Sequence, residues 1–313
     1  MTRAFVFPGQ GAQTIGMGAD LAKNYPDARA VFDEVDEALG EKLSDLIWNG
    51  EQNALTLTKN AQPALMATSL AALAALKSEG IGVEAASFVA GHSLGEYSAL
   101  AAAGAMSIAD TARLLRLRGE AMQAAVPVGQ GAMAAILGLN FEEVTSVAAE
   151  AAQGDVCAAA NDNDPGQVVI SGAAEAVERA VEIAKSRGAK RAMLLPVSAP
   201  FHCDLMSPAQ PTMAQALGEV DIERPSVPLV ANVLAHDISD PSTIRSLLVE
   251  QITHSVRWRE SVSWMVETSG VNEFWEIGAG KALSGMIRRI SRDVKTHQIG
   301  TAEGVAAAAE VLG

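Results

Sequence analysis

Aromatic side chains are scarce in this chain, in which Phe, Trp and Tyr make up 4% of 313 residues. Apolar residues still amount to 49%, so the core must consist mainly of Ala, Val and Leu. Small aliphatic side chains suit helices packed on a parallel sheet. The length allows one large domain or two unequal ones. The two cysteines, Cys157 and Cys203, are too few for a disulfide framework or a zinc site, which favours a reducing cytoplasm.

Basic residues are outnumbered, because 23 Lys and Arg face 37 Asp and Glu, a formal net charge of −14. The lack of a broad positive field argues against nonspecific binding to nucleic acid. Long apolar runs are also lacking, since the stretches 64–76 and 97–106 are too short for a bilayer and carry polar residues. The first residues, MTRAFVFPGQGAQ, turn polar too early for a signal peptide. We therefore expect a cytoplasmic protein that binds neither nucleic acid nor a membrane.

The first third of the chain predicts strands that alternate with helices. Residues 3–7 predict a short buried strand, and 63–76 predict a helix with Pro63 at its first position. Residues 87–93 predict a strand that runs into a turn, and 94–106 predict the helix after it. This alternation is typical of an α/β fold.

The segment from 131 to 197 has a different rhythm. It predicts strand, helix, strand, strand, helix and strand, with a turn over 161–166 between the two middle strands. This is the order of the ferredoxin-like split motif. Proline and glycines at 124–131 suit a domain boundary. We therefore predict a ferredoxin-like domain over 128–197, inserted into a larger α/β domain formed by 1–127 and 198–313.

The stretch AGHSLGEYSAL, residues 90–100, places Ser93 in the pattern G-x-S-x-G. One interpretation is a serine nucleophile, because Ser93 lies at a predicted strand–turn–helix junction, the context of a nucleophile elbow. The other is a helix cap, because Glu96 stands three residues on, where a capping box requires it. The pattern alone leaves both interpretations open.

Motifs for cofactors and metals fail. After Gly9 and Gly11, the dinucleotide fingerprint requires a glycine at the position of Thr14. The Gly-Lys pair that ends at Lys281 is not followed by Ser or Thr, so it is not a P-loop. The five histidines lack the spacing of metal ligands. We expect no metal and no cofactor.

His202 is the candidate general base. It follows the predicted strand at 191–197, after a Pro-Phe turn, and loops at strand ends collect catalytic groups in α/β proteins. The alternative is a histidine held by ordinary loop hydrogen bonds. His92 directly precedes Ser93, so we expect its side chain to point elsewhere.

Arg118 lies in the middle of an apolar helix face. On a helical wheel its neighbours within about 60° are apolar, namely Leu114, Leu115, Ala121, Met122 and Ala125. A guanidinium there is costly to desolvate unless it meets an anion. Three interpretations follow: an ion pair with an internal carboxylate, a side chain that reaches out to water, or a pocket cation that accepts a ligand carboxylate bidentately.

Six motifs in one order resemble those of malonyl-CoA:acyl carrier protein transacylases, over nearly the whole chain. They are FPGQGAQ at 7–13, AGHSLGEYSAL at 90–100, RLRGEAMQ around Arg118, NDNDPGQVVISG at 161–172, PVSAPFHCDLM at 196–206 and QITHSVRW at 251–258. Together they are far more specific than G-x-S-x-G alone. The resemblance implies an α/β-hydrolase-like body with a ferredoxin-like inserted domain.

The resemblance also implies a role for each matching residue. Ser93 would be the nucleophile and His202 its base, with the backbone carbonyl of Gln251 orienting the histidine. The amides of Gln10 and Leu94 would form the oxyanion hole.

Three further positions would contact the substrate. Arg118 would bind the malonyl carboxylate, and Gln62 in NAQPAL is an additional pocket candidate. Phe201 resembles the form associated with malonyl rather than methylmalonyl units in related acyltransferase domains.

The implied activity is transfer of malonyl from malonyl-CoA to the phosphopantetheine thiol of acyl carrier protein, for fatty acid synthesis, by ping-pong kinetics through a malonyl-serine. Malonyl-CoA is then a substrate rather than a cofactor, acyl carrier protein is the partner, and we expect a monomer. The alternatives are the malonyl transferase of malonate decarboxylase, an acyltransferase of a polyketide pathway, a serine thioesterase or esterase, and a non-catalytic carrier-binding protein.

Overall fold

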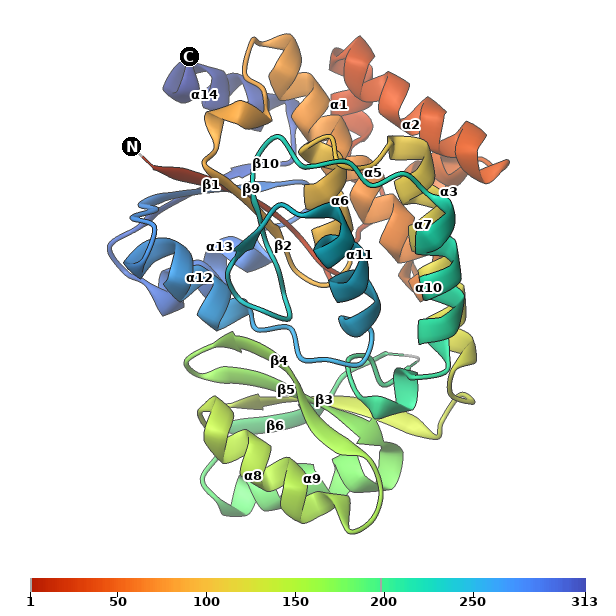
Figure 1. Ribbon diagram of the computed structural model, residues 1–313, viewed down its shortest axis with the longest axis vertical. Helices are drawn as coiled ribbons and strands as arrows, with labels where there is room; N and C mark the ends of the chain where they lie inside the picture. Colours follow the sequence, from red (N-terminus) through yellow and green to blue (C-terminus); the bar gives the residue numbers. More distant parts are fainter. Residues whose placement is uncertain (1, 198) are drawn as a thin grey trace.

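The computed structural model describes residues 2–197 and 199–313, which form a mixed α/β fold with two separate sheets (Figure 1). The larger sheet has the order β10-β9-β1-β2-β7-β8, and its pairs are parallel except β7 with β8. Its strands are β1 (Arg3–Phe7), β2 (Phe88–Gly91), β7 (Leu229–Val230), β8 (Asp237–Ile238), β9 (Glu273–Ile277) and β10 (Lys295–Ile299).

Helices cover both faces of this sheet. Successive side chains of a strand point to opposite faces, and β1 shows both environments: Phe5 and Phe7 join one apolar cluster, whereas Ala4 and Val6 join another. The helices are α1 (Ala19–Asn24), α2 (Pro26–Leu39), α3 (Leu43–Asn49), α4 (Gln52–Thr56), α5 (Thr58–Ser78), α6 (Gly95–Ala102), α7 (Ile108–Ala124), α10 (Ala209–Glu219), α11 (Pro241–Glu250), α12 (Trp258–Glu267), α13 (Ala282–Ile290) and α14 (Ala302–Leu312). None of the described helices is both long and apolar enough to cross a membrane.

The smaller sheet lies at the opposite end of the molecule in Figure 1. Its order is β4-β5-β3-β6, all pairs are antiparallel, and it is formed by β3 (Gly131–Leu137), β4 (Cys157–Asp164), β5 (Gln167–Ala173) and β6 (Arg191–Leu194). The helices α8 (Phe141–Ala152) and α9 (Ala174–Ser186) pack on it and share a separate apolar cluster with it. The order of elements predicted for 131–197 is confirmed. The predicted boundary at residue 198 falls outside the described residues.

Several predicted boundaries are wrong; the helix predicted over 94–106, for example, ends at Ala102. The helix predicted to start at Pro63 begins at Thr58, so Pro63 lies inside α5. The added turn is held in place because Asn60 and Gln62 accept hydrogen bonds from arginines of α7. The predicted turn at 161–166 is also too long, since β4 continues to Asp164.

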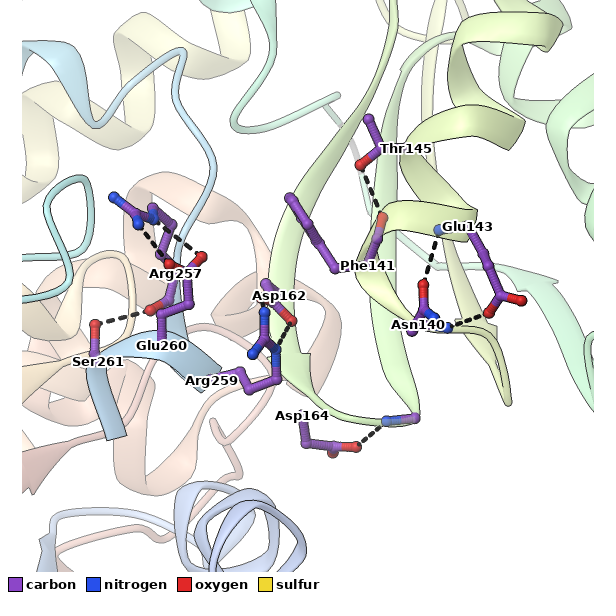
Figure 2. A network of polar contacts seen from close by, with 11 residues as sticks. Asn140, Phe141, Glu143, Thr145, Asp162, Asp164, Arg257, Arg259, Glu260 and Ser261 are labelled. Carbon is purple, nitrogen blue, oxygen red and sulfur yellow. Dashed lines mark hydrogen bonds and ion pairs between the residues drawn. The ribbon is translucent and has the colours of Figure 1, made fainter. Parts of the chain in front are cut away.

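The extension of β4 joins the smaller sheet to the segment before α12, in the larger part of the molecule. Asp162 donates its backbone N–H to the carbonyl of Val256, and Val256 donates to Ala160, each at 2.9 Å. The same stretch carries two ion pairs: Arg259 to Asp162 and Arg289 to Asp164, each 2.7 Å (Figure 2 shows the first). Both aspartates are buried and both arginines come from helices of the larger part. We call these contacts the seam.

Candidate active site

Ser93 lies on a tight turn between β2 and α6, with a backbone φ of 52°. The turn requires glycine on both sides, because a Cβ at Gly91 would lie 1.9 Å from the carbonyl oxygen of Gly95, and one at Gly95 would lie 2.3 Å from that of Phe7. The left-handed φ is strained for a non-glycine residue and is typical of a nucleophile elbow. The helix-cap interpretation is wrong: α6 has Leu94 at its N-cap and no side-chain cap.

Asn232 secures the turn, and the sequence analysis missed it. Its Oδ1 accepts from the backbone N–H of Ser93 at 2.8 Å, and its Nδ2 donates to the carbonyl of Gly91 at 2.7 Å. It lies two residues after the end of β7, the strand next to β2, so only the strand pairing brings it here. The short apolar stretch 227–231 before Asn232 was the only local signal.

His202 meets Ser93 at hydrogen-bond distance, with 2.8 Å between Nε2 and Oγ. Its Nδ1 lies 2.8 Å from the carbonyl oxygen of Gln251. A carbonyl only accepts, so this bond assigns the proton to Nδ1 and leaves Nε2 to accept from the serine hydroxyl. Burial and, next, the Arg118 charge lower the pKa of His202 to about 3. The imidazole is therefore neutral at ordinary pH.

Arg118 is 1% exposed, and its guanidinium has neutral partners. Nη1 donates to Oε1 of Gln62 at 2.8 Å, and Nη2 donates to Oε1 of Gln251 at 2.7 Å and to Oγ of Ser93 at 3.2 Å. Within the described residues it forms no ion pair, and its Nε–H has no hydrogen-bond partner. The internal ion pair and the arginine that reaches water are therefore both wrong.

Glu96 and Gln251 lie behind the Ser93 turn. Glu96, 1% exposed, accepts on one oxygen from Nε2 of Gln251 at 2.7 Å and from the backbone N–H of Asn232 at 3.2 Å. Burial raises the pKa of Glu96 to about 7, although both hydrogen bonds and the Arg118 charge oppose the rise. The sequence analysis considered Glu96 only as a helix cap.

A cavity of about 570 Å³ connects these groups. Seven of the eight predicted site residues line it: Gln10, Gln62, Ser93, Leu94, Arg118, Phe201 and His202. Gln251 lies behind the wall and touches the site through its hydrogen bonds. The opposite wall comes from the smaller sheet, through residues such as Met133, Gln167 and Val169.

His92 was expected to point away from the site, but it lines the cavity as well. Its Nε2 lies 2.9 Å from Oδ1 of Asn163. Burial lowers the pKa of His92, so it adds no charge to the site at neutral pH.

The arrangement suits nucleophilic acyl transfer to an acid-tailed substrate. A serine on a strained turn contacts a neutral imidazole, and a cation with one free donor stands 3.2 Å from the same oxygen. The backbone amides of Gln10 and Leu94 make no hydrogen bond to another group in 2–197 and 199–313. Both are thus free to meet an oxyanion.

The comparisons with known proteins agree over the full length. The family model for the acyl transferase domain matches residues 4–299. A malonyl CoA-acyl carrier protein transacylase of Bacillus subtilis (strain 168) is 47% identical over 99% of this chain and 96% of its own length. This chain belongs to the malonyl CoA-acyl carrier protein transacylase family.

Solved structures of malonyl transacylases have the same fold. An acyl-carrier-protein S-malonyltransferase from Bartonella henselae is 56% identical, with a TM-score of 0.97 over 100% of both chains. A malonyl-transacylase solved in complex with its type II PKS acyl-carrier protein is 42% identical, with a TM-score of 0.96 over 99% of this chain and 100% of that one. The transacylase family thus accounts for both sheets and not for the larger one alone.

Proposed function

We propose that this chain transfers the malonyl group of malonyl-CoA to the phosphopantetheine thiol of acyl carrier protein, supplying fatty acid synthesis. One observation carries the proposal beyond family membership: Ser93, His202 and Arg118 meet in one cavity, with both partners within 3.2 Å of the serine oxygen. The relatives' names supply the substrate and the carrier.

The first half-reaction forms a malonyl ester on Ser93. Nε2 of His202 takes the hydroxyl proton as Oγ attacks the thioester carbon. The C–S bond breaks, and His202 gives the proton to the leaving sulfur. Coenzyme A then departs as the free thiol. Arg118 pairs with the malonyl carboxylate, and its free Nε–H is available for that contact.

The tetrahedral oxyanion needs donors that are already in place. The amides of Gln10 and Leu94 are the proposed pair, because both residues line the cavity beside Ser93. One such donor is typically worth ~10²–10³ in rate. The buried ring of Phe201 occupies the cavity wall, where it would restrict an α-methyl branch.

The second half-reaction returns the enzyme to its resting state. The carrier thiol gives its proton to His202 and attacks the ester. His202 then returns this proton to Oγ of Ser93 as the bond between Oγ and the malonyl carbon breaks. Each step moves only protons and acyl bonds, so the scheme uses no metal and no cofactor. Coenzyme A leaves before the carrier reacts, so the kinetics are ping-pong.

Intact-mass analysis tests the proposal directly. Protein mixed with malonyl-CoA should gain one malonyl group on Ser93, and Ser93→Ala should gain none. Addition of acyl carrier protein with its phosphopantetheine arm should move the group to the carrier. If wild-type protein gains no malonyl group, or if it releases free malonate faster than it loads the carrier, the proposed function is wrong.

One observation favours a second assignment of the carrier. A malonyl-transacylase of the same fold is solved with a type II PKS acyl-carrier protein. Transfer rates to a fatty-acid carrier and to a polyketide carrier, measured side by side, separate the two pathways.

We also propose the finer domain description. The antiparallel order β4-β5-β3-β6, with its own apolar cluster, supports a ferredoxin-like domain over 128–197. A serine after a strand of the parallel sheet supports an α/β-hydrolase-like body for 1–127 and 198–313. Cys157 and Cys203 are both free, which supports a reducing cytoplasm as the compartment.

A further inference from the structure

A buried carboxyl group that forms no ion pair within the described residues lies one layer behind the serine. Glu96 is 1% exposed and forms no ion pair with any described residue. Both of its hydrogen-bond donors, Gln251 and Asn232, are neutral. A buried carboxylate is costly unless it is well satisfied. The acyl-transfer scheme above gives this group no task.

Gln251 links Glu96 to several parts of the site through its side chain and its backbone carbonyl. Its Nε2 donates to Glu96 at 2.7 Å and to the carbonyl of Ser93 at 3.1 Å. Its Oε1 accepts from Arg118 at 2.7 Å, and its backbone carbonyl holds Nδ1 of His202 at 2.8 Å. One residue thus contacts the turn, the cation and the imidazole.

An amide side chain has two orientations, related by exchange of its oxygen and nitrogen. Glu96 supports one of them together with the Ser93 carbonyl and Arg118, because the Glu96 oxygen that already accepts from Asn232 needs a second donor rather than another acceptor. Nε2 of Gln251 must then face Glu96, which directs Oε1 to Arg118. The reverse orientation would set oxygen against oxygen at Glu96 and N–H against N–H at Arg118.

We propose that Glu96 is a positioning residue for malonyl selection, acting through the Gln251 amide to hold the Arg118 guanidinium beside Ser93. This inference rests on the proposed function. Glu96 forms no hydrogen bond with Arg118 or His202 within the described residues. Its geometric link to both passes through Gln251, in addition to the direct attraction between Glu96 and the Arg118 charge. Removal of the Glu96 acceptor leaves the Gln251 amide held only by the Ser93 carbonyl and by Nη2 of Arg118, which loosens the acceptor that positions Nη2.

The test is a double-mutant cycle between Glu96→Ala and Gln251→Ala, the latter retaining the backbone carbonyl that holds His202. Rates are normalised to the amount of Ser93 that becomes esterified, so that misfolded protein is not counted. We expect each single variant to lower the preference for malonyl-CoA over acetyl-CoA by about tenfold. The double variant should be no worse than Gln251→Ala alone.

Glu96→Gln is the conservative rescue. The backbone N–H of Asn232 favours the amide oxygen of the new glutamine at the position of the Glu96 oxygen. That amide oxygen can therefore still accept from Nε2 of Gln251. The malonyl preference should stay within about threefold of wild type. Asp36→Ala is the matched control, because Asp36 is a buried acid that Ser44 holds and that does not line the cavity. It should lower stability without changing the preference.

If Glu96→Ala does not fold, Glu96→Asp replaces it, because the shorter side chain withdraws the acceptor and keeps the acidic group. The inference is overturned if folded Glu96→Ala or Glu96→Asp retains the wild-type preference, or if the losses multiply in the double variant. If the wild-type protein transfers malonyl normally but the losses of malonyl preference multiply in the double variant, only this inference is overturned. Wild-type protein that transfers no malonyl overturns the proposed function and this inference with it.

Discussion

Arg118 is a buried cation whose partners in the resting site are all uncharged. The guanidinium is held in position by hydrogen bonds to Gln62, Gln251 and Ser93, and none of these residues neutralises its charge. Burial lowers the pKa of Arg118, yet arginine stays protonated in proteins. The site is therefore poised to gain from an anion and to lose from a neutral ligand of the same shape.

Replacement of Arg118 by Ala should separate malonyl from acetyl substrates. We expect kcat/KM for malonyl-CoA to fall by at least about a hundredfold, because the charge-assisted contact to the carboxylate is lost. Reaction with acetyl-CoA should fall much less, since acetyl leaves the buried guanidinium unpaired in the wild type. Initial rates with both thioesters measure the ratio. A variant that still prefers malonyl-CoA would show that the carboxylate is bound elsewhere.

The low pKa of His202 predicts the pH dependence of Ser93 esterification. A base with pKa about 3 is deprotonated throughout the range from pH 5 to 6.5. Glu96, with its pKa raised to about 7, stays mostly protonated over the same range. The rate of ester formation, followed by quenched flow and intact mass, should therefore change by less than about twofold. A histidine at its ordinary pKa of about 6.5 would lose about fifteenfold between pH 6.5 and 5, and such a loss would contradict the assignment.

At the scale of elements, the turn between β2 and α6 is set by backbone packing as much as by the serine. Gly95→Ala places a Cβ 2.3 Å from the carbonyl oxygen of Phe7. We expect a loss of about 2 kcal/mol or more in the free energy of unfolding, because backbone must shift. Ester formation should fall in parallel as Ser93 is displaced.

Gly218→Ala is the matched control for this change. Gly218 lies on α10, has an ordinary φ, and leaves open space around the added methyl group. Alanine in a helix interior should raise stability by up to about 1 kcal/mol. Urea unfolding of both variants gives the comparison, and equal stabilities would refute the crowding argument.

Elements with a clear pattern were predictable, and those shaped by distant contacts were not. The strand at 3–7 and the elements of 131–197 were confirmed, because apolar periodicity and glycine breaks mark them. The start of α5 was missed because Pro63 signals a helix start locally, whereas the arginines of α7 hold the preceding turn. Likewise, the extension of β4 to Asp164 depends on the seam and has no local signal.

The same distinction holds within the site. Ser93 and Arg118 were identified from a motif and from an anomaly on an apolar face. Asn232 and Glu96 were not assigned their contacts, because those contacts join residues 139 and 155 positions apart, Ser93 with Asn232 and Glu96 with Gln251. Only strand pairing and helix packing bring such residues together.

At the scale of the whole molecule, the cavity depends on two bodies held in register. Ser93 and Arg118 belong to the larger sheet and its helices, whereas Met133 and Val169 belong to the smaller sheet. The seam fixes the distance between the walls through β4 (Figure 1) and through the ion pairs of Asp162 (Figure 2) and Asp164.

Arg259→Ala should therefore affect both stability and catalysis. It leaves the buried Asp162 without its cation, at a cost of about 3 kcal/mol in unfolding free energy, reduced by the 29% exposure of Arg259. KM for malonyl-CoA should rise because the cavity walls lose their fixed spacing. Arg113→Ala, which breaks an exposed pair with Asp110, is the control and should cost less than about 1 kcal/mol. If both variants unfold at the same urea concentration, the Arg259–Asp162 pair of the seam does not make this contribution to stability.

The unneutralised guanidinium also has a practical consequence for the choice of buffer. Acetate and formate are small anions that fit a cavity of about 570 Å³ and present the carboxylate that Arg118 lacks. At the concentrations used to hold pH near 5, they compete with the acyl donor for Arg118. The resulting fall in rate would look like a loss of activity caused by acidic pH. Sulfonate buffers of larger size keep that artefact out of any pH profile.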